Sequence, residues 1–165
     1  MSLAGLRTAL SADPIFARVR AFAGADPATR SADIAFSAPA GMRPVLLAEM
    51  ADGLAERSGS GPQGVMLAVT ATGREAEDTV AALRSYLPES AIAEFPSWET
   101  LPHERLSPRS DTVGRRLAVL RRLAHPELDA GARLRVIVAP IGGLGSWPAA
   151  GTSTNCLRGA SMKSK

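Results

Sequence analysis

The residues with the clearest potential for chemistry form a turn, 37–44, that follows a short apolar run. Phosphate-binding loops read G-x-x-x-x-G-K-[ST], because glycines let backbone N–H groups surround phosphate while lysine and hydroxyl reach the outer phosphates and magnesium. Here Gly41 remains, but Met42 stands in the lysine position and Arg43 in the hydroxyl position. Pro44 also removes a backbone donor. The turn predicts a degenerate phosphate-binding loop without catalytic or cofactor-binding residues, although Arg43 leaves anion contact at a helix N-terminus open.

A second glycine turn, 70–74, follows the most apolar segment of the chain. In a parallel sheet it would lie at the carboxyl end of a strand, where ligands of such sheets bind. A single glycine is weak evidence for a site. We therefore interpret the turn as a helix start capped by Thr72 or Thr70.

A proline-punctuated loop, 96–110, carries Trp98, Glu99, His103 and Glu104. One histidine with scattered carboxylates lacks metal-ligand spacing, and no nucleophile accompanies these residues. We therefore predict no catalytic residue and no metal site. Trp98 has two interpretations: it anchors a partner, or it folds back and buries its ring in its own domain.

Arginines are concentrated in the segment 103–125, which holds six of them against two acidic residues. Arg115 and Arg122 share a helix face opposite an apolar stripe formed by Val113, Leu117, Leu120 and Ala124. This face is either a contact surface for nucleic acid or an acidic protein, or a solvated helix face, which the lack of interleaved aromatic residues favours. The candidate interaction surface comprises Trp98, Glu99, Arg105, Arg109, Arg115 and Arg122.

The bulk composition is that of one globular domain. Of 165 residues, 45% are hydrophobic and 21% charged, a balance that excludes a disordered chain. No apolar run approaches the roughly 18 residues of a membrane span, and the first residues lack a secretory signal. Cys156 is the single cysteine, so no internal disulfide forms, which fits a reducing cytoplasm. A net charge of +3 permits nucleic-acid contact without predicting it.

Segments with the apolar pattern of a helix alternate along the chain with short apolar segments typical of strands, and this order predicts an α/β fold. We expect helices over the first two dozen residues, with Asp13 and Pro14 at a helix start, and then over 44–57, 74–86 and 111–124. We expect strands over 34–36, 65–70, 91–95 and 134–140. This order predicts a doubly wound, mostly parallel sheet of about four strands, of the P-loop NTPase type with a degenerate loop.

The stretch 65–126 also carries a specific pattern. Ser97-Trp98-Glu99-Thr100-Leu101-Pro102 is followed by Leu106-Ser107-Pro108, Asp111 and Arg115-Arg116-Leu117. This series resembles the N-terminal region of bacterial transcription-repair coupling factors, and the resemblance covers residues 30–141.

The resemblance implies a function for a longer parent. Family members are multidomain, ATP-dependent DNA translocases that release stalled RNA polymerase and recruit nucleotide excision repair. Their N-terminal module resembles the excinuclease B protein, with a helicase domain 1a-like fold that has lost its nucleotide site. ATP and magnesium therefore belong to other parts of the parent. Its partners would be the other parental domains and, through the whole protein, excision-repair proteins, RNA polymerase and DNA.

Two segments are expected on this basis. Residues 1–141 form the excinuclease-B-like domain, while 142–165 depart from the family pattern and read as an aberrant, disordered tail produced by a frameshift or truncation. We expect the fragment to be a non-catalytic interaction domain. The alternatives are a small nucleotide-binding α/β enzyme and a minor basic nucleic-acid-binding module.

Overall fold

A computed structural model of the chain describes residues 4–26, 34–58, 64–98, 109–128 and 132–146. Its five α-helices within these ranges are α1 Ala4–Ser11, α2 Pro14–Gly24, α3 Arg43–Ser58, α4 Gly73–Leu83 and α5 Ser110–Ala124. Its three strands are β1 Met66–Thr70, β2 Ile92–Glu94 and β3 Val136–Pro140. Short 3-10 turns connect some of these elements, and one of them, η4, spans Ile141–Ser146.

The three strands form one parallel sheet with the order β1-β3-β2. Val136 on the central strand is in register with Met66 on one side and Ile92 on the other. All five residues of β3 are buried, as expected for a central strand covered on both faces. The α/β class and the parallel sheet predicted from the sequence are thus confirmed.

The strand expected at 34–36 is wrong, because residues 34–39 pair with no strand in the described part of the chain. Phe36 instead packs edge-on against Phe22 of α2, with ring centroids 6.1 Å apart, and reaches the core beside α3. A three-residue apolar run does not distinguish strand pairing from packing against a helix. The described sheet therefore has three strands where about four were expected, and the strand that would precede a phosphate-binding turn is missing from it.

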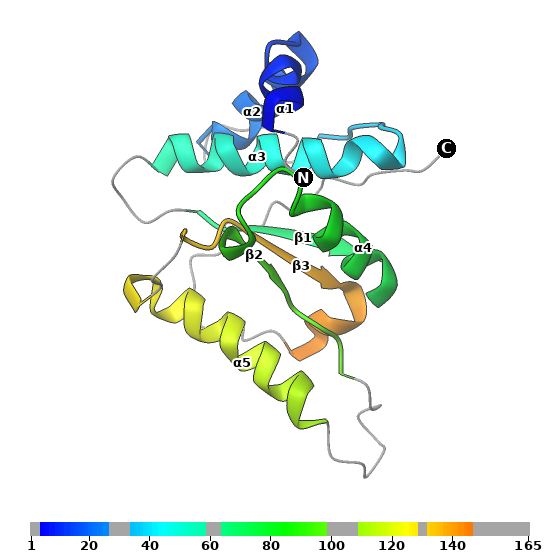
Figure 1. The fold of residues 1–165 in the computed structure, drawn as a ribbon, viewed down its shortest axis with the longest axis vertical. Coiled ribbons are helices and arrows are strands. Elements are labelled where there is room, and N and C mark those ends of the chain that lie inside the picture. Colours follow the sequence, from blue (N-terminus) through cyan, green and yellow to red (C-terminus); the bar gives the residue numbers. More distant parts are fainter. Residues whose placement is uncertain (1–3, 27–33, 59–63, 99–108, 129–131, 147–165) are drawn as a thin grey trace.

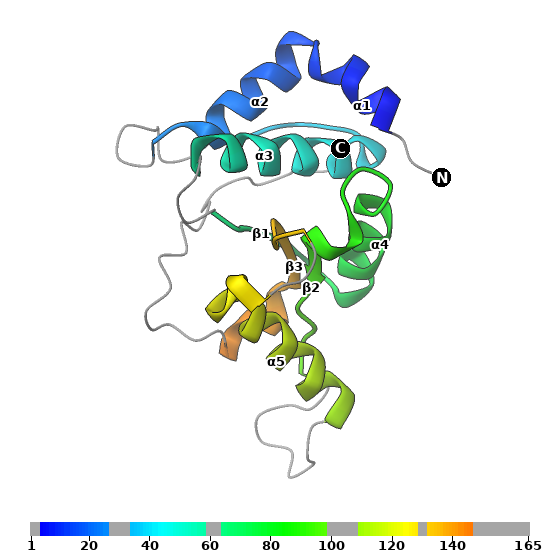
Figure 2. The ribbon, with the colours of Figure 1, turned by 60° about the vertical axis from the view of Figure 1, so that its left-hand side comes forward.

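The helices lie on two sides of the sheet (Figures 1 and 2). The side chains of Met66, Ala68 and Val138 meet α2, α3 and α4 in a first core cluster, and α1 packs outside on α2. The opposite face of the sheet presents Ala93 and Ile137 to Val119 of α5 in a second, smaller cluster. Successive residues of a strand point to opposite faces, which explains the division into two clusters.

The N-terminal helices form where the sequence predicts a helix start. Asp13 is the N-cap of α2, its carboxylate accepts a hydrogen bond of 2.7 Å from the Ile15 N–H, and Pro14 occupies the first helical position. Asp13 also separates α1 from α2, so the first two dozen residues form two helices.

Helix α2 then packs closely on α3. A Cβ added at Gly24 would lie 3.1 Å from the carbonyl oxygen of Gly53. Small residues at this crossing therefore let the two helix backbones approach each other.

Candidate functional site

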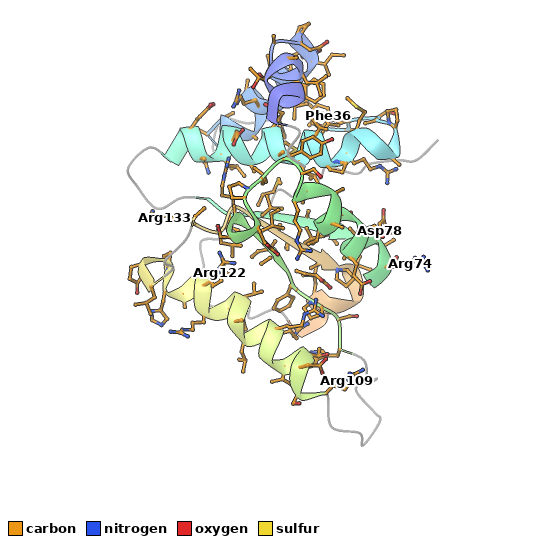
Figure 3. The ribbon with its side chains drawn as sticks, in the orientation of Figure 1. Phe36, Arg74, Asp78, Arg109, Arg122 and Arg133 are labelled. Carbon is orange, nitrogen blue, oxygen red and sulfur yellow. The ribbon has the colours of Figure 1, made fainter. Side chains whose placement is uncertain are left out.

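The degenerate phosphate loop leads directly into α3. Gly41 and Met42 form a 3-10 turn, and Met42 packs its side chain partly against the first core cluster. Nη1 of Arg43 lies 3.5 Å from Oε1 of Glu75 on α4. The open groove beside this turn is also lined by Asp78, whose place on α4 is labelled in Figure 3. Two carboxylates and one guanidinium thus line the groove, and this excess of negative charge disfavours a phosphate group here.

The polar groups in the turn after β1 form hydrogen bonds with one another. Thr72 is the N-cap of α4, and its hydroxyl accepts a hydrogen bond of 3.2 Å from the Glu75 N–H. The Glu75 carboxylate accepts a hydrogen bond of 3.1 Å from the Ala71 N–H. Thr70 donates its hydroxyl hydrogen to the Thr72 carbonyl. Of the two expected caps, Thr72 is therefore the one that the structure uses, and Glu75 both supports the cap and holds Arg43.

This cap gives a first testable prediction. Replacing Thr72 with alanine is expected to lower the free energy of unfolding by about 1 kcal/mol, because the Glu75 N–H loses its acceptor. Urea unfolding followed by circular dichroism measures this change. Thr79→Ala, the same substitution inside α4, is the matched control and should stay within about 0.5 kcal/mol of the wild type. Equal losses in both variants would contradict the assigned cap.

A buried arginine occupies the carboxyl edge of the sheet beside β2 and β3. Arg116 of α5 is 3% exposed. Its guanidinium lies 3.9 Å from the Phe95 ring centroid and 4.3 Å from that of Trp98. It donates hydrogen bonds to the carbonyl oxygen of Pro96 and to that of Gly143, the latter at 3.2 Å from both Nη atoms. We call Arg116 with Phe95, Trp98, Pro96 and Gly143 the Arg116 clasp.

The Arg116 clasp joins three segments that are distant in sequence. Desolvation lowers the pKa of the Arg116 guanidinium from its ordinary value. It still carries its charge at neutral pH, because arginine normally titrates far above this range. Gly143 fits closely, since a Cβ there would lie 3.3 Å from the Ser97 nitrogen and 3.4 Å from the carbonyl oxygen of Phe95. The clasp therefore occupies the part of the carboxyl edge beside β2 and β3, and ligands of parallel sheets bind at that edge.

Residues 141–146 take part in this arrangement. Gly143 is buried in η4, and Leu144 packs partly against the second core cluster. The first residues of the segment expected to be an aberrant tail thus contact the sheet domain. The domain boundary at 141 stays a prediction, and residues 147–165 lie outside the described part of the chain.

Three of the remaining candidate interaction residues, Arg109, Arg115 and Arg122, have partners within the fold. Nη2 of Arg115 lies 2.6 Å from Oε2 of Glu94, and Arg122 donates a hydrogen bond to the Ser90 carbonyl oxygen. Arg109 precedes α5 and pairs with Asp111 at 3.4 Å. Figure 3 shows Arg109 and Arg122 at opposite ends of α5. Glu99 and Arg105 lie outside the described residues, and the use of this surface for binding stays a prediction.

The apolar stripe expected on α5 is not its buried face. Thr112, Arg116 and Val119 are buried, whereas Leu117 is 59% exposed and Ala124 is also exposed. The expectation assumed that the most hydrophobic face turns inward. In the structure Arg116 takes the inner position, because carbonyl groups and aromatic rings at the sheet edge satisfy its charge.

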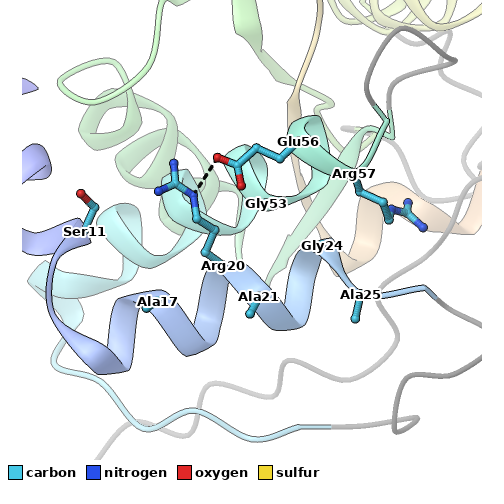
Figure 4. A pocket seen from close by; sticks show the side chains of 9 residues that line it. All are labelled: Ser11, Ala17, Arg20, Ala21, Gly24, Ala25, Gly53, Glu56 and Arg57. Atoms are coloured by element: carbon cyan, nitrogen blue, oxygen red, sulfur yellow. Dashed lines mark ion pairs between the residues drawn. The ribbon is translucent and has the colours of Figure 1, made fainter.

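Sequence reasoning also missed an ion-pair network between α2 and α3. Arg20 lies near three carboxylates on one face of α3, at 3.7 Å from Glu49, 3.4 Å from Asp52 and 3.3 Å from Glu56. Asp52 also pairs with Arg135, the residue just before β3. Figure 4 shows Arg20 and Glu56 at the adjoining pocket between the helices. The spacing of the acids on one helical face was the available signal, but their partner was not visible in the sequence.

Metal-binding clusters and membrane spans are both missing from the described ranges. No group of three or more histidine, cysteine, aspartate or glutamate side chains is placed there to hold a metal ion. None of the helices in these ranges is long and apolar enough to cross a membrane.

The fold and the carboxyl edge of its sheet define a class: a small parallel α/β domain with a buried arginine beside the ends of β2 and β3. No family model matches the chain. The transcription-repair-coupling factors of Mycobacterium bovis (strain ATCC BAA-935 / AF2122/97) and Mycobacterium tuberculosis (strain CDC 1551 / Oshkosh) are each 49% identical to it over 121 residues. These alignments cover 66% of this chain and 10% of each relative.

The chain is therefore related to transcription-repair coupling factors, and it spans about a tenth of the length of the relatives it matches. This confirms the resemblance seen in the tryptophan loop and the start of the arginine-rich helix.

Proposed function

We propose that this chain is a non-catalytic interaction module of the transcription-repair coupling factor type. The parent protein would be an ATP-dependent DNA translocase of the cytoplasm, which acts on stalled RNA polymerase and recruits excision repair. The module would contact other domains of the parent or repair proteins. It uses no cofactor itself, and ATP and magnesium belong to the parent's motor.

The Arg116 clasp is the observation that carries this proposal. Parallel α/β enzymes bind ligands at the carboxyl edge of the sheet, where loops leave a crevice. In this chain the loop after β2, the turn after β3 and the guanidinium of Arg116 contact one another at that edge. A nucleotide would have to displace a buried charge from two carbonyl groups and two aromatic rings.

The degenerate turn supports the same proposal independently. Arg43, the one cation of that turn, pairs with Glu75, and Met42 packs against the core. The small-enzyme alternative would need a phosphate cradle here. The basic-module alternative would use Arg115 and Arg122, which contact Glu94 and Ser90 in this fold.

ATP turnover by the 165-residue chain, with and without duplex DNA, tests the proposal. We expect phosphate release equal to that of the buffer blank in both conditions. Arg43→Ala serves as the matched control, because a real site at the turn would lose activity in this variant while a contaminating ATPase would not. DNA-stimulated turnover that disappears in Arg43→Ala would refute a non-catalytic role.

A further inference from the structure

The sheet face that carries α5 is only partly covered by the elements that the structure describes. Helix α5 is about 10 Å wide with its side chains, whereas strands lie about 4.8 Å apart, so one helix covers about two strands. Helix α5 contacts β2, which is at one edge of the order β1-β3-β2. Strand β1 lies at the other edge, and its Val69 side chain is 48% exposed.

The apolar flank of α5 faces the edge strand β1. Arg115 and Arg122 bind Glu94 and Ser90, and so turn one flank of the helix toward the outer edge of β2. The exposed stripe occupies the opposite flank, because it is separated from the two arginines by the buried face of the helix. This flank therefore turns toward β1.

The two apolar surfaces meet at the second core cluster. Leu67 of β1 and Leu120 of α5 both pack partly against it. Val69 lies two residues beyond Leu67 and therefore on the same face of the sheet. We call the surface formed by Leu67, Val69, Leu117, Leu120 and Ala124 the apolar corner.

We propose that the apolar corner docks an amphipathic α-helix with acidic residues along its flank, an inference that deepens the proposed function as an interaction module. A helix fits because it would cover β1 as α5 covers β2, and both faces of parallel sheets are normally covered. A groove also runs along α5, lined by Leu117, Ala118, Leu120, Arg121, Ala124 and His125. Grooves between rows of side chains on one helix accept the rows of another.

The positive charge of Arg121 beside the apolar corner favours an acidic partner. Arg121 follows Leu117 by one turn, is exposed, and has no ion-pair partner among the residues that the structure describes. The other described arginines of α5 each contact a group of this chain. A second copy of the chain would bring the same basic rim to the corner, which disfavours self-association.

The test uses the full chain and a synthetic amphipathic helix of about five turns, with leucines on one face and glutamates on its flanks. A matched peptide carries lysines in place of the glutamates. Fluorescence anisotropy at low salt measures both affinities. We expect the glutamate peptide to bind at least about tenfold more tightly than the lysine peptide, and Arg121→Glu to reverse this order.

A pair of serine variants locates the binding surface. Leu117→Ser is expected to weaken binding of the glutamate peptide about tenfold, since one leucine-sized contact is lost. Ile15→Ser changes a side chain that is 63% exposed on α2, away from the corner, and should leave the affinity unchanged. Equal affinity for both peptides, equal effects of the two serine variants, or no binding of the glutamate peptide at millimolar concentration would overturn the proposal.

A concentration-dependent dimer in analytical ultracentrifugation that Leu117→Ser abolishes would also overturn it, by assigning the corner to a second copy. None of these outcomes involves ATP. Failure of the peptide to bind is therefore distinguishable from failure of the proposed non-catalytic function, which the turnover assay decides.

Discussion

Replacing Arg116 with methionine is expected to lower the free energy of unfolding by about 3 kcal/mol. Methionine keeps some contact with the Phe95 and Trp98 rings, but it has no donor for the carbonyl groups of Pro96 and Gly143. Leaving a buried acceptor without a donor costs about 1 to 3 kcal/mol, and losing a desolvated cation–ring contact costs about 2 kcal/mol more. Because the methionine thioether replaces part of these contacts, the expected loss of about 3 kcal/mol is smaller than the sum of the separate costs.

Arg115 supplies the matched control one residue earlier on the same helix. Its ion pair with Glu94 is exposed on the arginine side, so Arg115→Met should cost less than about 1 kcal/mol. Urea unfolding, followed by circular dichroism and by tryptophan fluorescence, compares the two variants. If Arg115→Met costs as much as Arg116→Met, the clasp does not hold the sheet edge together.

Replacing Gly53 with alanine is expected to cost about 3 kcal/mol or more. A Cβ at this position would overlap the carbonyl oxygen of Arg20 and lie 3.3 Å from the Ala23 side chain. Both obstacles are part of α2, and a backbone carbonyl moves only if the whole helix shifts. We expect α2 to move away from α3 and to weaken the ion pairs between Arg20 and the acidic face of α3.

The control is Gly114→Ala on α5, where a Cβ would have no neighbour within 4 Å. This change should raise stability by about 0.5 to 1 kcal/mol, because alanine favours the helix more than glycine does. Thermal and urea unfolding of both variants measure the difference. A neutral Gly53→Ala would mean that α2 and α3 are not in close contact at this crossing.

Most helices and three of the strands followed from local sequence signals. Asp13 and Pro14 marked the start of α2, and the apolar run at 134–140 marked the central strand. These features depend on neighbours within one turn or one strand, which the sequence displays directly. The run at 34–36 failed because its outcome depends on Phe22, a distant residue whose ring offers Phe36 a packing partner.

The buried face of α5 could not be predicted from the sequence for a similar reason. Hydrophobic periodicity placed Leu117 inside and could not anticipate that a charged residue would be buried. Arg116 is buried because the Gly143 carbonyl and the Phe95 ring, which come from two other segments, converge on it. Such a position depends on tertiary contacts that a single sequence does not show. The exposed stripe that results is the surface we assign to a partner helix.

The most direct test of a closed, non-catalytic sheet edge is an amide NMR titration of the full chain with Mg-ATP. We expect no saturable shifts at residues 40–44, at 71–73 or around Arg116 up to millimolar nucleotide, because Arg43 pairs with Glu75, Thr72 caps α4, and Arg116 is hydrogen-bonded to Gly143. Saturable shifts that converge on these residues would contradict the proposed non-catalytic role, since they would show a nucleotide site beside the Arg116 clasp or the Arg43 ion pair.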